Sequence, residues 1–430
     1  MTLKTVAEIR DPVHGYIKIT GVERAVIDSP FVQRLRRIHQ LAGAYMVYPG
    51  AVHTRFDHVL GAMHVAGLMA ESIANNIHLD KTKIQDIRLA ALLHDVGHGP
   101  FSHLFEEVLA EKTNLTHEDI SQKIVLKSNV RDILENYGIS SRKISDLCVG
   151  KLNKPPYMNE IVAGGLSADI MDYLLRDSYF TGVEYGKVDI HRIIDSIEIV
   201  NSHLALNQAA LYAFEAILIA RYEMFKAVYF HRTVRASELM LVHSMSLASN
   251  ALKLTDFSRI DNYLRLTDEV VFDRLMNLNA NTPELRIARK LAQDHNNRRL
   301  VKCVFEKVMQ RKDRTVERIF DQSRFRQELA RDIARKAAVN ETDVYVDVPT
   351  TPSVPYTYTR EAPSSLILVQ EDPTGKSHKT VPINELQLVG SITGFMDILR
   401  VYTQEENRKK VAGAVHELFG GNGFMTRISV

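Results

Sequence analysis

Cysteine is scarce in this sequence of 430 residues, which has only Cys148 and Cys303, with no other candidate ligand near either. A disulfide framework and a zinc–thiolate site are therefore poor interpretations, and two reduced thiols are favoured. Long apolar runs are also missing, since none reaches the roughly 18 residues that span a membrane. The mixed N-terminus, Met1 to Arg10, carries no apolar signal segment. We therefore expect a cytoplasmic protein with no membrane partner.

An excess of charge of one sign is lacking as well. Lysine and arginine number 54 against 52 aspartates and glutamates, which leaves a net charge of +2. Such a balance does not indicate a nucleic-acid-binding protein. The basic residues from Gln310 to Lys336 are interleaved with acidic ones, so a solvated helix with i,i+4 pairs is favoured over a nucleic-acid groove. No glycine-rich loop follows a predicted strand, which argues against a P-loop or a dinucleotide-binding fold.

Helical periodicity dominates most of the chain, and 45% hydrophobic residues suffice for a sizeable core. Thr116 and Asp119 resemble a capping box that opens a helix through Val125. A second helix should stop at the run from Gly97 to Pro100, because glycine and proline end helices. The expected helices are Asp57–Ile77, Ile87–Val96, the one that Thr116 opens, Ala168–Phe180 and Gln208–Asn250.

The composition changes near residue 340, where valine, threonine, tyrosine and proline become frequent. This pattern predicts short strands and turns. The expected elements are strands at Val344–Val348, Thr357–Thr359, Ser365–Gln370 and Asp397–Tyr402, and a helix at Glu405–Phe419. We therefore predict a mainly α protein, with a large helical domain over residues 1–335 and a small α+β C-terminal lobe over residues 336–430.

Histidine is clustered, because eight of the 17 lie between His53 and His117. Such clustering points to a metal or acid–base site. The set His58, His94, Asp95 and Asp169 combines two imidazoles with two carboxylates, a mixture that suits one Fe, Mn, Zn, Co or Ni ion. Taken singly, each residue has an ordinary explanation, such as a cap, a packed ring or a solvated helix end. Their joint occurrence favours function.

His94 and Asp95 are adjacent, so their side chains would diverge by about 100° within a helix. They can share a metal ion only at a helix end or a helix crossing. The glycine at position 97 supplies such an end.

Four segments together resemble the deoxynucleoside triphosphate triphosphohydrolases of the HD-domain phosphohydrolase superfamily. They are QRLRRIHQL from Gln33, RFDH from Arg55, HDVGHGPFSH from His94 and DIMDY from Asp169. The similarity runs from about Ile9 to about residue 250. It implies an HD-domain helical bundle whose core spans about residues 50–180.

The resemblance also implies a role for individual residues. His58, His94, Asp95 and Asp169 match the metal ligands, and Mg²⁺ is a further candidate as the companion of the substrate phosphates. His117 matches the proton donor to the leaving 5′-oxygen, with Glu106 as its carboxylate partner, where the family has aspartate. Other residues match the family's substrate-binding residues. Those expected to contact phosphate are His98, His103, Arg55, Arg221 and Tyr173. Gln40 and Asp177 match the residues that hold the sugar 3′-hydroxyl, and Leu41 and Tyr229 match those that crowd the 2′ position.

The implied reaction is hydrolysis of a deoxynucleoside triphosphate at the α-phosphorus, with metal-activated water as nucleophile. Two alternatives stay open. One is an HD enzyme for another nucleotide phosphoester, and the other is a nucleic-acid-binding or regulatory protein that keeps the fold. Salt-sensitive nucleic-acid binding with little turnover would indicate the second.

A regulatory site is implied near the N-terminus, where Asp28, Gln33 and Arg36 match residues that read an activating guanine nucleotide between subunits. Asp28 can accept from the guanine N1–H and amino edge, and Arg36 can donate to O6. The alternative is a surface helix in which Asp28 and Ser29 act as caps and Arg36 is solvated. On the first interpretation we expect a homo-oligomer, a dimer or tetramer, that guanine nucleotides activate.

Overall fold

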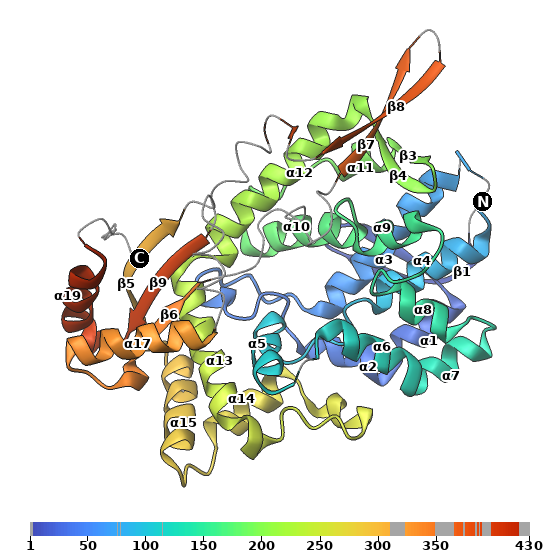
Figure 1. Cartoon of the computed structure of the whole chain (residues 1–430). Helices are drawn as coiled ribbons and strands as arrows, with labels where there is room; N and C mark the ends of the chain where they lie inside the picture. The colour runs from blue at the N-terminus through green and yellow to red at the C-terminus, as the bar shows by residue number, and fades with distance from the viewer. Residues whose placement is uncertain are drawn as a thin grey trace.

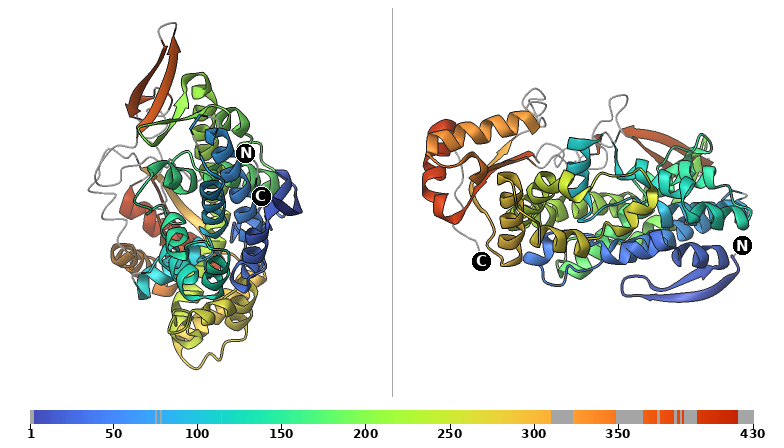
Figure 2. Two further views of the ribbon diagram at one scale, coloured as in Figure 1. Left: turned by 90° about the vertical axis from the view of Figure 1, so that its right-hand side faces the viewer. Right: turned by 90° about the horizontal axis from the view of Figure 1, so that it is seen from below.

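A large helical body makes up most of the molecule, with a small lobe of sheet and helix at one end and a hairpin, β7 (Ser365–Asp372) and β8 (Gly375–Pro382), projecting at the other (Figures 1 and 2). The prediction of a mainly α fold is confirmed. The computed structural model describes residues 3–74, 76–77, 79–113, 115–309, 323–348, 365–372, 375–382, 385–386, 388 and 397–420.

The first half of the chain begins with an antiparallel hairpin, β1 (Thr5–Asp11) and β2 (Gly15–Thr20), which sequence periodicity did not predict. The expected helix at Asp57–Ile77 forms as α3 (Arg55–Ala74), and Thr116 and Asp119 do form the predicted capping box. The remaining helices of this half are α1 (Gly21–Ile27), α2 (Pro30–Arg34), α4 (Lys81–Leu93), α5 (His103–Lys112), α6 (His117–Lys127), α7 (Asn129–Asn136), α8 (Ser141–Leu147), α9 (Pro156–Ala163), α10 (Ala168–Thr181) and α11 (Ile190–Ile194).

The second half contains the long helices that flank the small lobe. The prediction of one continuous helix over Gln208–Asn250 is wrong. The chain forms α12 (Leu211–Met224), a π-helical turn (Phe225–Tyr229) and then α13 (Arg232–Leu252), so the predicted helix breaks at residues 230–231. The other elements are β3 (Ile197–Val200), β4 (His203–Asn207), α14 (Asp268–Met276), α15 (Pro283–Asn296), β5 (Lys302–Met309), α17 (Ser323–Ala337), β6 (Val344–Asp347), β7 (Ser365–Asp372), β8 (Gly375–Pro382), β9 (Asp397–Thr403) and α19 (Arg408–Phe419).

Strands from distant parts of the chain meet in two larger sheets. One has the order β3-β4-β7-β8, in which β4 and β7 are parallel, and the other has the order β5-β9-β6, which is antiparallel throughout. The division of domains at residue 335 stays a prediction. The second sheet nevertheless joins a strand from before that residue, β5, to two strands from after it.

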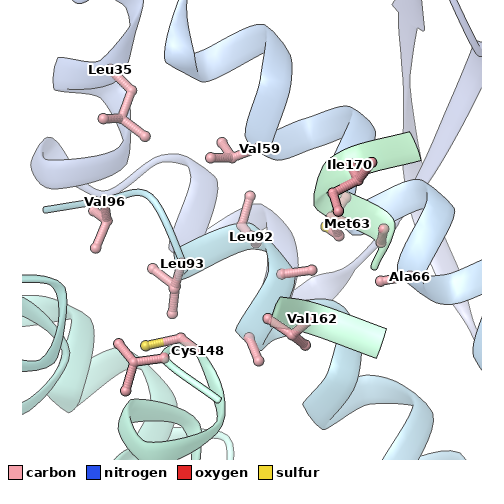
Figure 3. Packing of buried hydrophobic residues seen from close by; sticks show 14 of the residues in the cluster. Leu35, Val59, Met63, Ala66, Leu92, Leu93, Val96, Cys148, Val162 and Ile170 are labelled. Atoms are coloured by element: carbon pink, nitrogen blue, oxygen red, sulfur yellow. The ribbon is translucent and has the colours of Figure 1, made fainter. Parts of the chain in front are cut away.

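The core of the helical body lies where α3, α4, α9 and α10 pack together, because each presents a face of branched or small apolar side chains. Val59, Met63, Leu92 and Leu93 are fully buried there, and Figure 3 shows them converging from α3 and α4. Burial of each such side chain contributes roughly 1.5–3 kcal/mol. This packing sets the spacing between the helices that carry the predicted metal ligands.

The basic stretch at residues 310–336 was predicted to be a solvated helix, and the part of it within the described residues is α17. That helix is not solvated all round, because Ile333 and Ala334 are fully buried against the small lobe. Residues 310–322 and the strand predicted at Thr357–Thr359 lie outside the described residues. Among the helices that the structure describes, none has the length and apolar character of a membrane span.

Candidate active site

The four predicted metal ligands meet at one point of the helical body, which we call the metal cluster. His58 lies in the first turns of α3, His94 caps the C-terminus of α4 with Asp95 directly after it, and Asp169 lies in the first turn of α10. His58 Nε2 is 3.1 Å from Asp169 Oδ1 and 3.6 Å from Asp95 Oδ2. His94 Nε2 is 3.3 Å from Asp95 Oδ1 and 3.7 Å from Asp169 Oδ1. The helix predicted over Ile87–Val96 ends sooner, at Leu93, and this earlier helix end allows His94 and Asp95 to face one centre.

The hydrogen bonds behind both imidazoles leave a nitrogen of each ring turned toward this centre. His94 Nδ1 lies 2.7 Å from the carbonyl oxygen of Ala91, which can only accept, so Nδ1 carries the proton. His58 Nδ1 is 2.8 Å from the carboxylate oxygen Oδ2 of Asp172, so this Nδ1 carries a proton as well. Among the described residues, neither buried Nε2 atom has a partner in good hydrogen-bond geometry, although carboxylate oxygens lie near both. Two buried imidazole nitrogens beside two carboxylates fit a divalent metal ion, which would take the place of a proton there, and partners behind the rings are the usual supports of metal-bound histidines.

The charge of the metal cluster also favours a cation. Burial lowers the pKa of His58, but the neighbouring carboxylates of Asp169 and Asp172 outweigh burial and raise the pKa to about 10. Burial opposes ionisation of Asp95, yet His94 and Arg55 hold its pKa well below the usual range. The pocket is thus rich in ionised carboxylates, and a positive charge placed among them is stabilised.

A second group, His98, His103, Glu106 and His117, lies beside the metal cluster and is called the outer cluster. It forms because α6 packs directly on Gly97. A Cβ atom at that residue would lie 2.2 Å from the carbonyl oxygen of His117, so only glycine allows this approach. The rings of His98 and His117 are stacked with centroids 4.0 Å apart. His98 Nε2 lies 3.4 Å from Asp95 Oδ1, which links the two clusters.

Glu106 organises the outer cluster. One carboxylate oxygen is hydrogen-bonded to His117 Nδ1, and the other lies 2.8 Å from His103 Nδ1. Burial lowers the pKa of His117, but the hydrogen bond with Glu106 outweighs it and the pKa is raised. Burial and the nearby charges of Arg55 and His117 instead hold the pKa of His98 well below its usual range. The surroundings thus favour the protonated form of His117 and the neutral form of its stacked neighbour His98.

Both clusters open into one cavity of about 1400 Å³. Apart from His58, which lies behind the wall, every residue predicted to bind metal, act in catalysis or hold substrate lines it. These residues are Gln40, Leu41, Arg55, His94, Asp95, His98, His103, Glu106, His117, Asp169, Tyr173, Asp177, Arg221 and Tyr229. Residues separated by almost 190 positions in the chain therefore share one space, although their individual roles stay predictions.

The part of the cavity along α10 carries aromatic and polar groups held by one another. Tyr229 donates a hydrogen bond to Asp177 Oδ2 at 2.6 Å, and His53 Nε2 lies 2.8 Å from Asp177 Oδ1. Arg221 donates to the hydroxyl of Tyr173. Gln40 Oε1 is buried without a hydrogen-bond partner among the described residues. A buried amide oxygen of this kind is an acceptor available to a ligand hydroxyl.

Sequence reasoning missed several residues that hold these groups in place, notably Asp268. Its carboxylate accepts hydrogen bonds from the backbone N–H of His39 at 2.9 Å and of Phe101 at 2.6 Å. Phe101 and Ser102 both have positive φ, at 60° and 56°, an unusual conformation that external support must hold. Ser102 in turn accepts from Arg55 Nε at 2.9 Å. Asp268 thus braces the turn before His103, and no local signal marks it because its partners lie more than 160 residues away.

Arg55, which was predicted to bind phosphate, already uses part of its guanidinium to hold other residues of the site. Its guanidinium donates to Asp95 Oδ2 and to Ser102 Oγ, and its side chain is buried. Its predicted contact with phosphate therefore has to use the donors that remain. The observed contacts make it a support for Asp95.

The three residues of the predicted activator site lie together on the surface, away from the cavity. Asp28 is the C-cap of α1, and its exposed carboxylate lies 3.8 Å from Arg24 Nε. Gln33 donates to the carbonyl oxygen of Ile27 at 2.8 Å and accepts from Arg36 Nε at 2.9 Å. Ser29 precedes α2 without a capping hydrogen bond from its side chain. The site is therefore neither excluded nor supported by these contacts and stays a prediction.

Comparison with known proteins places these features in context. The HD domain profile matches residues 55–177, and the profile of the HD-associated region matches residues 188–422, which is more than half of the chain. An uncharacterized protein of Methanocaldococcus jannaschii is 37% identical over 259 residues, covering 59% of this chain and 52% of the relative. A deoxynucleoside triphosphate triphosphohydrolase SAMHD1 homologue of Dictyostelium discoideum is 28% identical over 319 residues, covering 70% of this chain and 60% of the relative.

The fold has a solved counterpart as well. A crystal structure of a hypothetical protein from Aquifex aeolicus superimposes with a TM-score of 0.74 at 26% identity, and the match covers 95% of this chain and 99% of the other. The match thus includes the small lobe as well as the helical body. The two curated relatives, in contrast, are matched over little more than half of their own lengths.

Proposed function

Because this chain belongs to the HD-domain phosphohydrolase family, we propose that it hydrolyses deoxynucleoside triphosphates to a deoxynucleoside and inorganic triphosphate. The observation that carries the proposal is that the metal cluster, the outer cluster and the polar groups along α10 all line a single cavity. A deoxynucleoside triphosphate carries a triphosphate, an ester oxygen and a sugar, so it has a partner for each of these groups.

The metal ion would be held by His58, His94, Asp95 and Asp169, and when bound it lowers the pKa of water so that hydroxide is available near neutral pH. The rest of the chemistry falls to side chains. His117, whose protonated form Glu106 favours, donates a proton to the departing 5′-oxygen, a role that typically contributes roughly 10²–10⁴-fold to the rate. Arg221, His103 and the spare donors of Arg55 neutralise the triphosphate.

The groups at the α10 end would read the sugar. Gln40 offers its unpartnered oxygen to the 3′-hydroxyl, with Asp177 beside it. Tyr229 is held in place by its hydrogen bond to Asp177, and with Leu41 it leaves little room for a 2′-hydroxyl. A rigid tyrosine excludes an extra oxygen better than a mobile one, because it cannot turn aside.

The test is turnover of the purified protein with each dNTP and each NTP, in the presence of Mn²⁺, Fe²⁺, Co²⁺, Ni²⁺, Zn²⁺ and Mg²⁺, with products separated by chromatography. We expect a deoxynucleoside and triphosphate, and a preference for dATP over ATP of up to about 100-fold, the size of discrimination that a pocket achieves against one hydroxyl. Leu41→Ala should reduce that preference, and Leu68→Ala, at a half-buried site on α3 away from the cavity, serves as control. Equal turnover of dATP and ATP by wild type would overturn the sugar assignment.

Two other functions have weaker support. An HD enzyme for a smaller phosphoester would release phosphate from nucleoside monophosphates or cyclic nucleotides in the same assay. A nucleic-acid-binding protein would show salt-sensitive binding without turnover. The intact metal cluster and the hydrogen-bonded His117–Glu106 pair support hydrolysis over the second alternative.

A further inference from the structure

The N-terminal hairpin reaches the back of the metal cluster through its turn. Its strands, within residues 5–20, lie outside both matched regions, 55–177 and 188–422. His14 Nε2, in the turn, lies 2.6 Å from Asp172 Oδ1, and its side chain is only 5% exposed. The other oxygen of this carboxylate, Oδ2, lies 2.8 Å from His58 Nδ1. One fully buried carboxylate therefore joins the hairpin to a metal-ligand candidate.

A single arginine fixes both this carboxylate and the hairpin turn. Arg176 donates to Asp172 Oδ2 from Nε at 2.9 Å and to Asp172 Oδ1 from Nη2 at 2.8 Å. Its third nitrogen, Nη1, donates to Asp11 Oδ2 at 2.8 Å. The other oxygen of Asp11 accepts from the backbone N–H groups of Val13 at 2.9 Å and His14 at 2.8 Å. The turn and the carboxylate are thus parts of one hydrogen-bonded network.

The helix that carries His58 leaves space for this network at Gly61. A Cβ atom there would lie 1.8 Å from Asp172 Oδ1 and 2.3 Å from Arg176 Nη2. Any side chain at this position would push the carboxylate away from α3. The Asp172–Arg176 pair therefore packs directly on the helix backbone, one turn from the imidazole that it supports.

We propose that His14 is a positioning residue of the metal site: by holding Asp172 against His58 it orients the imidazole, so that hairpin docking and metal binding stabilise each other. The proposal rests on the metal site of the proposed function. Coupling of this kind is reciprocal, because a hairpin that strengthens metal binding must itself be held more firmly when metal is bound. Hydrogen-bond partners behind a ligand are worth roughly 10–100-fold in metal affinity. Because Arg176 also holds Asp172, the lower end of that range is expected for His14.

The first experiment measures Mn²⁺ affinity from the electron paramagnetic resonance signal of the free ion. His14→Phe keeps a ring of similar size but removes the donor, and should raise the Kd for Mn²⁺ about tenfold. His14→Gln retains an N–H at similar reach and should recover most of the affinity. Tyr16→Ala, in the same hairpin but with its side chain outside the network and 59% exposed, should leave the Kd unchanged.

The second experiment follows hydrogen–deuterium exchange of the hairpin amides. Its main measurement is made on the wild-type protein and therefore does not depend on whether a variant folds. Mn²⁺ should slow exchange across residues 11–20, and His14→Phe should abolish that response. A residue with a merely structural role would lower the melting temperature without changing the Kd of the folded protein.

The outcomes separate the two proposals. If wild type binds no divalent metal ion, the proposed function and this inference fall together. If wild type binds Mn²⁺ but folded His14→Phe binds it equally well, or the hairpin amides do not respond to Mn²⁺, the coupling alone is wrong.

Discussion

The metal cluster and the outer cluster both combine histidines with carboxylates, but they differ in what surrounds each imidazole ring. In the metal cluster, His58 is fully enclosed, with carboxylates on both sides and no opening to the cavity. In the outer cluster, the side chain of His117 is 23% exposed and has a single carboxylate partner behind it. An enclosed imidazole with its Nε2 directed at two acids is suited to hold a cation. A half-open imidazole with one acid behind it is suited to hand a proton to a ligand.

The largest expected effect is on the metal cluster. Asp95→Ala should remove both bound metal and turnover, because Asp95 is within 3.6 Å of both histidine Nε2 atoms and is the residue shared with the outer cluster. His94→Ala should do the same. Metal content by mass spectrometry and dATP turnover are the measurements. Asp132→Ala, on the exposed face of α7, is the control. Full metal occupancy in an inactive Asp95→Ala protein would show that Asp95 is not a metal ligand.

The next effect is on the outer cluster alone. His117→Ala should keep its metal and lose roughly 10²–10⁴-fold in turnover, the usual contribution of a general acid. The pair of His203 and Glu160, with Nδ1 and Oε1 2.6 Å apart on an exposed surface, offers a matched control in His203→Ala. Wild-type rates in His117→Ala would reject the proton donor, and loss of metal would assign His117 to the first cluster.

A smaller effect is expected from the carboxylate behind His117. Burial lowers the pKa of His117 and the hydrogen bond with Glu106 raises it, with a net increase. Turnover that needs the protonated ring is present below that pKa and lost as pH rises through it. Glu106→Gln lowers the pKa, so the alkaline limb of the kcat profile should move down by roughly one to three pH units. An unchanged limb in Glu106→Gln would mean that His117 does not donate the proton.

The smallest effect concerns the surface near α1, outside both clusters. If Asp28 reads guanine, GTP should raise wild-type dATP turnover about fivefold or more, and Asp28→Ala should not respond. Light scattering would show whether GTP also favours a dimer or tetramer, because a ligand shared across an interface stabilises the assembly that builds its site. Lack of response in wild type, or an equal response in both proteins, would remove this site from consideration.

The sequence predicted the parts of the site that depend on local chemistry. The capping box of Thr116 and Asp119 starts α6 and thereby sets the position of His117. A helix end near Gly97 was predicted, but α4 ends at Leu93 rather than at Val96, and the second role of the glycine was not visible. That glycine is also the surface on which α6 packs, and a contact between residues 97 and 117 leaves no periodic signal.

The supports behind the site could not be predicted. Asp172 lies inside the recognised segment DIMDY, yet nothing local says that it faces His58 and His14 rather than solvent. Asp268 braces Phe101 across 167 positions of the chain. The break in the predicted helix at residues 230–231 was missed for a related reason, because apolar periodicity continues through it while tertiary packing decides the backbone.

By itself, the sequence determined the ligand types, the helical character of the body and the order in which functional groups occur, because these follow from side-chain chemistry and a short repeat. The tertiary structure alone decided which acid lies behind which imidazole, and therefore which ring nitrogen is free. It also decided that β4 pairs in parallel with β7 and that the N-terminal hairpin docks beneath His58. The contacts of β4 with β7, of His14 with Asp172 and of Asp172 with His58 join residues more than 100 positions apart, and they are selected by the packing of whole elements rather than by any local pattern.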